Sequence, residues 1–289
     1  MYGVSPAYFI SRFGQGFSLA EVHDALPDLK QCGFDAFQPE VYLEERLGEW
    51  QSGAKRLGRA AREQGLHTQQ FVAHFLMHHF GNASALRSSA LGDLTSRVVE
   101  VVLAIGDCPA VVVPIPGYET DTEEHSSADA LIDARRLTTE RIAAMLEIVE
   151  PSGLRLGLEI LPGSLIDGSD GFLSLASEIG SSTIGLCLDT GHAWASHEDV
   201  AQIPAKMGDR IVGTHLCDND GDVNTSWRPG TGTIEWDDLV GALLSSAYSG
   251  SWDIEIGCAA EHVESEYREA LAFLRRARNF HEAPTRPTR

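Results

Sequence analysis

The chain has 289 residues, of which 43% are hydrophobic and 22% are charged, and its formal net charge is −20. This composition is that of an ordinary globular protein with a sizeable core, and it excludes a disordered, collagen-like or disulfide-stapled chain. The strong negative charge argues against nucleic acid and anionic membranes as partners, because binding to phosphates rests on lysine and arginine.

The cysteines and the first residues bear on the cellular compartment. Five cysteines are scattered along the chain, and no CxxC pair occurs. Such usage is typical of a reduced cytoplasmic protein. The chain does not start with a basic segment followed by a long apolar run, as a secretory signal does. No stretch reaches the roughly 18 apolar residues of a membrane span, so we expect a cytoplasmic protein without a membrane segment.

Short apolar runs alternate with longer helical patterns along the chain. Continuous apolar runs are typical of strands that are buried on both faces of a parallel sheet. We predict eight strands: Tyr2–Ser5, Phe34–Gln38, His67–Phe71, Ala110–Val113, Leu154–Leu158, Ile184–Leu188, Ile211–His215 and Trp252–Ile256. We predict helices between them over residues 19–32, 44–64, 89–106, 126–150, 170–180, 198–207, 235–247 and 263–280. Ser18 and Glu21 form the pattern of a capping box at the start of the first helix.

Eight strand–helix repeats in a chain of this length predict an α/β fold, a single (β/α)8 TIM barrel. An open doubly wound sheet is the alternative, but no G-x-G-x-x-G follows the first strand and no phosphate-binding loop motif occurs. We place the barrel at residues 1–281 and expect residues 282–289 to be a flexible tail. The longest predicted loops, 72–88 and 114–126, follow strands, where barrels build their active sites.

One polar side chain stands at the end of each of the last four predicted strands: Glu159, Asp189, His215 and Glu255. In a parallel barrel these strand ends are neighbours around one rim, so we expect the four side chains to converge. Clustered carboxylates repel one another, and a divalent cation bound between them is the simplest way to offset this repulsion. Three carboxylates and one imidazole suit Mn²⁺, Mg²⁺ or Co²⁺, and they also admit Zn²⁺ or Fe²⁺.

Three further residues are candidates for contact with a substrate. His192 follows Asp189 by three positions. This spacing suits a residue that supports the metal ligands or contacts the substrate, and it suits equally a residue that only begins a helix. His74 is the loop histidine nearest to the end of the third predicted strand. Arg228 directly precedes the P-G-T-G turn, where a guanidinium can clamp an anion or a hydroxyl or simply face solvent.

These motifs resemble those of the xylose isomerase-like TIM-barrel superfamily, in particular its sugar phosphate isomerase/epimerase group. The matching segments are GFDAFQPE, GLEI, CLDTGHAW, THLCDNDG, PGTGTIEW and DIEIG. The resemblance implies one metal ion, with Mn²⁺ as the first choice, held by Glu159, Asp189, His215 and Glu255, and a sugar or sugar-like substrate. It also implies that Glu159 and Glu255 form the acid/base pair on opposite faces of a ketose, through a metal-stabilised enediolate, with His192 on a substrate hydroxyl.

The sequence departs from the ketose epimerases of this group at two places. Those enzymes usually carry another glutamate six residues after the first metal-binding one, where this chain has Leu165. Their substrate arginine lies further before the Pro-Gly turn than Arg228 does. A metal-dependent isomerase or epimerase is the leading hypothesis. A lyase on the same fold, similar to inosose dehydratases or C-glycoside deglycosidases, is the alternative.

Other functions fit the sequence less well. Relatives that bind several metals, including the class II apurinic endonucleases, place an aspartate and a histidine where we align Asn224 and Ser226. Phosphodiester hydrolysis and DNA repair are therefore not expected. The presence of all four ligands disfavours a non-catalytic sugar-binding or partner-binding barrel. A homo-oligomer or a partner subunit is compatible with the sequence.

Overall fold

The computed structural model describes residues 1–120 and 127–282. Its strands are β1 Tyr2–Val4, β2 Ala36–Phe37, β3 His67–Thr68, β4 Phe71–Val72, β5 Ala110–Ile115, β6 Arg155–Ile160, β7 Ile184–Asp189, β8 Ile211–His215 and β9 Trp252–Ile254. Its α-helices are α1 Ala7–Phe13, α2 Leu19–Cys32, α3 Leu47–Glu63, α4 Leu91–Ile105, α5 Ala128–Val149, α6 Gly168–Ile179, α7 Thr190–Ala195, α8 Ile203–Met207, α9 Trp236–Ser245 and α10 Val263–Glu282. Short 3₁₀ helices include η2 His74–His79 and η3 Ala85–Arg87.

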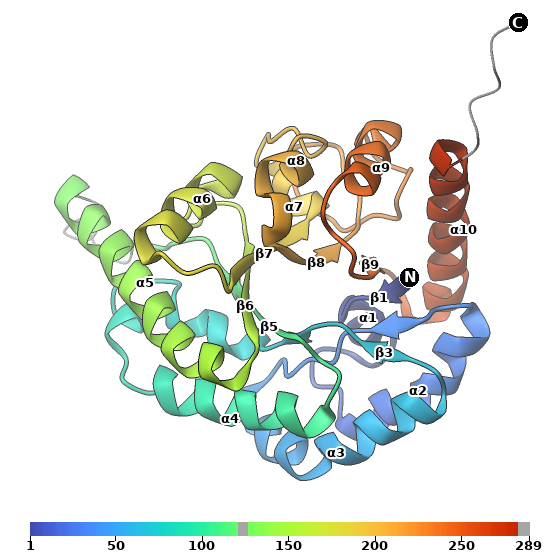
Figure 1. The fold of residues 1–289 in the computed structure, drawn as a ribbon, viewed down its shortest axis with the longest axis horizontal. Coiled ribbons are helices and arrows are strands. Elements are labelled where there is room, and N and C mark those ends of the chain that lie inside the picture. Colours follow the sequence, from blue (N-terminus) through green and yellow to red (C-terminus); the bar gives the residue numbers. More distant parts are fainter. Residues whose placement is uncertain (121–126, 283–289) are drawn as a thin grey trace, which may run out of the picture.

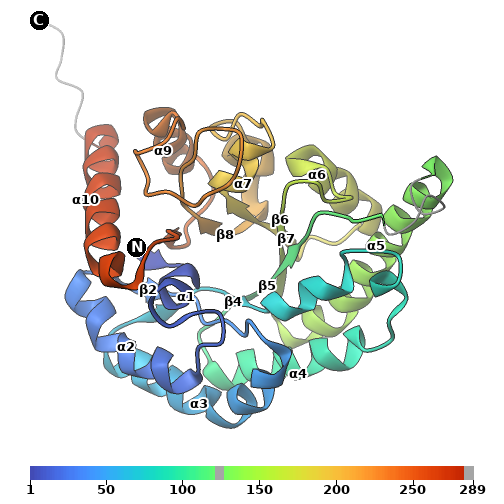
Figure 2. The same cartoon turned by 180° about the vertical axis from the view of Figure 1, so that it is seen from behind.

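The strands are parallel and close into a barrel, and a ring of helices surrounds them (Figures 1 and 2). They pair in the orders β3-β2-β1-β9 and β4-β5-β6-β7-β8. Single bridges between Glu40 and Val72 and between Leu216 and Ile254 join the two sets. With β3 and β4 counted as one barrel strand, the predicted (β/α)8 TIM barrel is confirmed, and the open doubly wound sheet is wrong.

The apolar runs form strands because the barrel buries both of their faces. Every residue of β5 and β7 is buried. Around them, helices turn one apolar face inward. In α2 this face holds Leu19, Val22, Leu26 and Leu29, and the helix opens with the predicted capping box. The strand and helix periodicities thus direct the chain toward one core between barrel and helices.

The third predicted strand, His67–Phe71, is present as two short pieces. In β3, His67 is in register with Ala36 of β2, whereas in β4, Phe71 is in register with Val111 of β5. Barrel strands are tilted and staggered, so one stretch of chain can pair with one neighbour first and with the other neighbour later. The apolar pattern of the sequence does not indicate that this strand changes its pairing partner.

Two short helices, α1 and α7, were not predicted. They have seven and six residues, too few for a repeating apolar face. Burial of Tyr8 and Phe9 holds α1 in place. The carboxylate of Asp189 caps α7, where its Oδ1 accepts a hydrogen bond from the backbone N–H of His192 at 2.7 Å.

The predicted helix over residues 198–207 is shortened to α8. The side chain of Asp199 accepts hydrogen bonds from the backbone N–H of Ala201 and from the amide of Gln202. Such local bonds offer the backbone an alternative to a helix. The chain therefore makes a turn there, and the helix begins only at Ile203.

The structure describes one predicted loop in full, and the other loop and the predicted tail in part. The loop over residues 72–88 contains η2 and η3. The first residues of the loop over 114–126 continue β5, and residues 121–126 lie outside the described residues. The helix α10 ends at Glu282, and the rest of the predicted tail, 283–289, also lies outside them.

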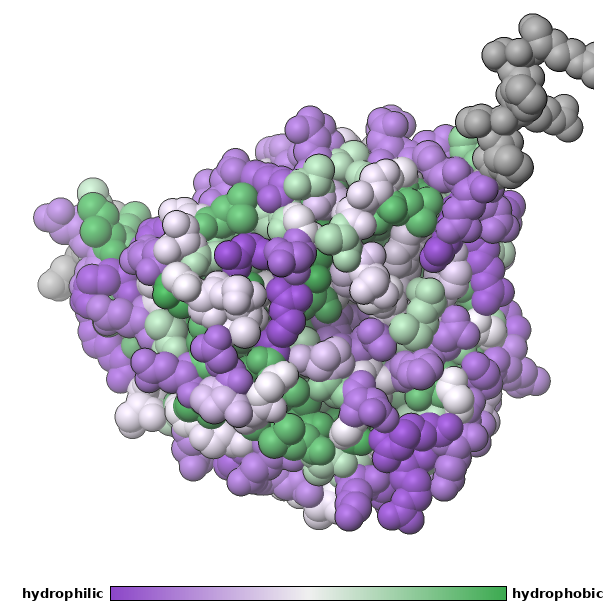
Figure 3. Space-filling model, in the orientation of Figure 1, coloured by the Kyte–Doolittle hydropathy of each residue, from purple (hydrophilic) through white to green (hydrophobic). Residues whose placement is uncertain are grey.

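The surface is mainly polar. On the face seen in Figure 3, hydrophilic residues predominate, and hydrophobic residues form separate patches. Among the residues that the structure describes, no helix combines the length and the apolar character needed to cross a bilayer. All five cysteines are free thiols, so the barrel is held together without a disulfide.

A buried aspartate fixes the long loop between β8 and α9. Asp218 is fully buried and accepts hydrogen bonds from the backbone N–H groups of Asn219, Gly230 and Ile234 and from the indole N–H of Trp236. Gly230 has a φ of 85°, which residues with a side chain rarely adopt. The P-G-T-G turn is therefore tied to the end of β8.

We expect Asp218→Asn to destabilise the protein by about 3 kcal/mol. In the wild type the N–H donors share a buried carboxylate, whereas the side-chain amide of asparagine would turn an N–H group of its own toward some of them. Denaturant unfolding followed by circular dichroism measures this change. Asp222→Ala, at an exposed position of the same loop, is the matched control and should leave stability unchanged. Equal stability of the two variants would contradict the role of Asp218.

Candidate metal centre

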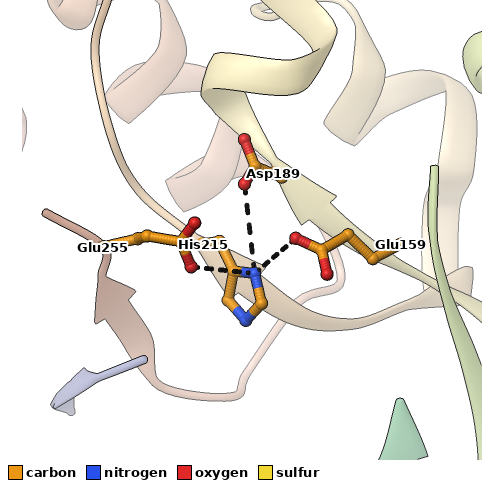
Figure 4. Close-up of side chains that lie close together, drawn as sticks. All are labelled: Glu159, Asp189, His215 and Glu255. Carbon is orange, nitrogen blue, oxygen red and sulfur yellow. Dashed lines mark hydrogen bonds and ion pairs between the residues drawn. The ribbon is translucent and has the colours of Figure 1, made fainter. Parts of the chain in front are cut away.

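The four predicted ligands meet at the carboxyl ends of four neighbouring strands. Glu159 lies in β6, Asp189 and His215 end β7 and β8, and Glu255 directly follows β9. Asp189 and His215 are opposite each other in the β7–β8 pairing. Each of the four residues offers one ligand atom within 4.8 Å of the others, and Figure 4 shows the three carboxylates around one ring nitrogen. The common rim of a parallel barrel brings them together.

The imidazole of His215 is the centre of this cluster. Its Nδ1 lies 2.7 Å from Oε1 of Glu159, 3.2 Å from Oε2 of Glu255 and 4.0 Å from Oδ2 of Asp189. The side chains of Glu159, Asp189 and His215 are at most 7% exposed, and that of Glu255 is 15% exposed. Water screens charges weakly at such burial, so the three carboxylates need a positive partner.

An unpaired oxygen indicates that the cluster fits a metal ion. Oδ2 of Asp189 is buried and has no hydrogen-bond partner among the described residues. A buried carboxylate oxygen without a partner is costly. Two ring nitrogens lie near it, Nε2 of His192 at 3.7 Å and Nδ1 of His215 at 4.0 Å. Three carboxylates and one imidazole form a donor set for a divalent cation.

The second nitrogen of His215 is held by a chain of buried hydrogen bonds that begins with Gln38, directly after β2. Its Nε2 lies 2.8 Å from Oε1 of Gln38. The amide of Gln38 donates to Oδ2 of Asp253 at 2.9 Å, so its oxygen is the atom that faces the imidazole. Asp253 in turn accepts from the hydroxyl of Ser251. This relay keeps a proton on Nε2 and leaves Nδ1 as the atom that can bind a metal.

Burial and mutual repulsion shift the pKa values of the cluster. Burial, with the charge of Glu159 as a further cause, raises the pKa of Asp189 to about 7. Burial also raises the pKa of Glu255 to about 7. Burial disfavours the charged form of Glu159, but the facing His215 outweighs it and lowers that pKa to about 2. Burial likewise disfavours the charged form of His215, but the surrounding acidic groups raise its pKa well above the usual value.

His192 lies beside the cluster. Its Nε2 is 3.9 Å from Oε1 of Glu159 and 3.7 Å from Oδ2 of Asp189. Its Nδ1 lies 3.0 Å from Nδ2 of Asn224, and the oxygen of that amide accepts the backbone N–H of Ser226. Asn224 therefore donates to Nδ1, and a neutral His192 carries its proton on Nε2. Burial lowers the pKa of His192, which favours this neutral form.

His74 and Arg228 lie apart from the four clustered residues. His74 forms an ion pair with Glu40, with 3.3 Å between Nδ1 and Oε1. Arg228 forms ion pairs with Glu266 and Glu269 of α10. A guanidinium that two carboxylates already hold is not free to clamp a substrate, so this placement gives no support to the predicted role of Arg228.

Three residues that contact predicted site residues have no role in the sequence analysis: Gln38 contacts His215, Glu40 contacts His74, and Asn224 contacts His192. Gln38 and Glu40 follow the second barrel strand, so the strand-end rule that selected the four ligands also points to them. In the sequence their segment, GFDAFQPE, contributes only to the family resemblance. Asn224 lies in a loop, and no sequence pattern indicates that it reaches His192.

Comparisons with known proteins agree with this architecture. Residues 26–277 match the family described as Xylose isomerase-like TIM barrel. A D-tagatose 3-epimerase-like protein superposes with a TM-score of 0.76 at 19% identity, over 98% of this chain and 99% of that chain. The IolI protein, crystallised with a zinc atom, superposes with a TM-score of 0.73 at 15% identity, over 97% of this chain and 98% of that chain. Identities this low support the fold alone.

Curated sequences add a more local similarity. The D-psicose 3-epimerase of Enterocloster bolteae is 27% identical over 120 residues, which are 40% of this chain and 38% of that protein. Two longer matches cover 55% and 50% of their proteins. The chain thus spans about half the length of these two curated relatives.

We expect Mn²⁺ to raise the melting temperature more at about pH 8 than at about pH 5.5. Without metal, folded Asp189 and Glu255 keep their protons up to about pH 7, whereas in the unfolded chain they lose them near pH 4. Rising pH therefore destabilises the metal-free fold, and the loss of the His215 proton adds to this effect. The protons on Asp189, Glu255 and His215 also compete with a cation, so the cation binds more strongly at the higher pH. Thermal unfolding with and without Mn²⁺ measures the effect, and an equal rise at both pH values would contradict it.

We expect Asp189→Asn to reduce bound metal roughly tenfold or more, because it removes a charged donor from the cluster. Elemental analysis after dialysis against a limiting concentration of Mn²⁺ measures the occupancy. Asp209→Asn, at an exposed position, is the matched control. Undiminished metal in Asp189→Asn would remove this residue from the ligand set.

Proposed function

Because the chain belongs to the xylose isomerase-like TIM barrel family, we propose that it is a divalent-metal-dependent enzyme that isomerises or epimerises a sugar or a polyol-derived ketone. The observation that carries this proposal is the convergence of three buried carboxylates on Nδ1 of His215. The printed names of its relatives, a D-tagatose 3-epimerase-like protein and a D-psicose 3-epimerase, support a sugar as the substrate. A cytoplasmic location and self-association stay predictions.

The residues that would hold the ion are Glu159, Asp189, His215 and Glu255, and Mn²⁺ is our first choice. A divalent ion held there would supply a Lewis acid against negative charge that develops on substrate oxygens. The unpaired Oδ2 of Asp189 and the fixed Nδ1 of His215 support this assignment. Gln38 keeps the imidazole oriented while a substrate enters and leaves.

Glu159 and Glu255 are the proposed acid/base pair. They approach His215 from strands on either side of it (Figure 4), so a ketone bound between them would have one carboxylate toward each face. One carboxylate removes the proton from the carbon next to the carbonyl, and the other returns a proton to the opposite face. The configuration of that carbon is thereby inverted. If the proton is instead returned to the former carbonyl carbon, and the hydroxyl proton of the neighbouring carbon moves to the former carbonyl oxygen, the carbonyl moves to the neighbouring carbon.

His192 is the proposed contact to a substrate hydroxyl. Asn224 occupies its Nδ1, so the Nε2–H group is available as a hydrogen-bond donor next to Glu159 and Asp189. A donor at this place would orient a sugar oxygen with respect to the two carboxylates. The prediction that Arg228 holds the substrate requires it to leave Glu266 and Glu269.

We expect Glu159→Gln and Glu255→Gln each to reduce turnover more than about a hundredfold, the usual scale for lost general acid–base catalysis. The measurement is incorporation of solvent deuterium next to the carbonyl across a panel of ketoses and polyol ketones, with the Mn²⁺-loaded enzyme. Glu261→Gln, at an exposed position, is the control. Near-normal exchange in either site variant would remove the acid/base assignment, and no exchange by the wild type with any ketone would refute the proposed function.

A further inference from the structure

A second ionisable pair lies at the barrel mouth, apart from the candidate metal centre. Glu40 follows β2, and His74 follows β4 by two residues; the bridge between Glu40 and Val72 places these two strand ends side by side. Nδ1 of His74 is 3.3 Å from Oε1 of Glu40, whose side chain is only 2% exposed. The ring of Tyr42 stacks on His74 with 4.0 Å between centroids and 22° between planes. A carboxylate and an aromatic face therefore fix the imidazole.

The pair has unused hydrogen-bonding capacity. Nε2 of His74 makes no hydrogen bond within the described ranges 1–120 and 127–282, and its side chain is 23% exposed. Oε2 of Glu40 is buried and has no hydrogen-bond partner among the described residues. A buried ion pair adds little to stability, and an unpaired buried oxygen reduces it. Stability therefore does not explain this pair, whereas a ligand that binds to Nε2 of His74 would.

The order of the strands puts the pair across the mouth from the candidate metal centre. Around the barrel, β1 separates β2 from β9, and β5 separates β4 from β6. In a ring of eight strands, β2 and β4 therefore face β7 and β8, which carry two of the candidate ligands. Burial alone would lower the pKa of His74, but Glu40 and then the more distant Glu159 and Glu255 outweigh it and raise it. A ligand held at the metal centre by one end can thus reach His74 with its other end.

The free ring nitrogen suits a neutral hydroxyl group. Nδ1 faces a carboxylate and carries a proton, so Nε2 accepts a hydrogen bond when the imidazole is neutral and donates one when it is charged. A hydroxyl group fits both states, because it can donate and accept. A phosphate group would need further cations. The charge of His74 is already balanced by Glu40, and Arg228 is held by Glu266 and Glu269.

We propose that His74 is a specificity-determining residue whose Nε2 binds a hydroxyl group of the substrate remote from the carbonyl, and that Glu40 and Tyr42 are positioning residues for its imidazole. This inference rests on the proposed function, because the metal centre must hold the carbonyl end. The strand ends fix the separation between that centre and the pair. The site therefore selects a ketose whose remote hydroxyl has the matching position and configuration and is not phosphorylated.

The test changes the protein and the substrate in parallel. Mn²⁺-loaded wild type and His74→Asn are incubated in D₂O with D-fructose, D-psicose and D-tagatose, with their 4-, 5- and 6-deoxy analogues and with their 6-phosphates. Nuclear magnetic resonance of deuterium next to the carbonyl gives kcat and KM. We expect one deoxy analogue to lower the kcat/KM of the wild type about tenfold, mainly through KM, as for one lost hydrogen bond. The variant should show this loss on the parent ketose and no further loss on that analogue.

Two comparisons separate binding by the imidazole from its effect on packing. The amide of asparagine can still reach Glu40 but does not extend to the position of Nε2, whereas that of His74→Gln does, so His74→Gln should recover part of the discrimination. Tyr42→Leu removes the stacked ring and should weaken discrimination about threefold, and Tyr42→Phe, which keeps the ring, should lose less. The matched control is His78→Asn, an exposed histidine of the same 3₁₀ helix, which should change neither kcat nor KM.

The outcomes distinguish this inference from the proposed function. Melting temperatures show whether each variant is folded, and the comparison of analogues by the wild type needs no variant. If the wild type turns over a ketose and all its deoxy analogues equally well, the inference is wrong and the proposed function stands. Equal discrimination by the wild type and folded His74→Asn, or faster turnover of a 6-phosphate than of its parent ketose, would also overturn it. No exchange by the wild type with any ketose would refute both.

Discussion

Three buried carboxylates share one imidazole nitrogen at the mouth of this barrel, and the balance of their charge constrains the residues around them. Without a cation, protons supply the balance: the pKa values of Asp189 and Glu255 rise to about 7, and His215 keeps its proton. A divalent ion would displace these protons. Metal binding, protonation and folding stability are therefore coupled through the same few atoms.

The surrounding residues fix the orientation of this cluster rather than its charge. Gln38 determines which nitrogen of His215 faces the carboxylates, and Asn224 does the same for His192. The Gln38 relay needs space, because a Cβ at Gly3 would lie 1.9 Å from Oδ1 of Asp253. Asp218 ties down the loop that carries Asn224. A site of this kind depends on a rigid frame as much as on its ligands.

The pair of Glu40 and His74 gives the mouth two distinct sides. One side concentrates carboxylates on a single nitrogen and suits a metal ion. The other holds an imidazole on a carboxylate.

The barrel and its four candidate ligands could be predicted from the sequence, because both follow from local repeats: apolar runs of strand length, helical stripes between them, and one polar residue at the end of each late strand. A parallel barrel brings such ends to one rim whatever the intervening loops do. Which side chains meet across the barrel or through loops follows from the three-dimensional packing alone. It split the third strand between two neighbours, set Arg228 against α10, and paired Gln38 with His215 and Glu40 with His74. These contacts join residues far apart in the chain or on different strands, and their geometry comes from packing, which no local pattern records.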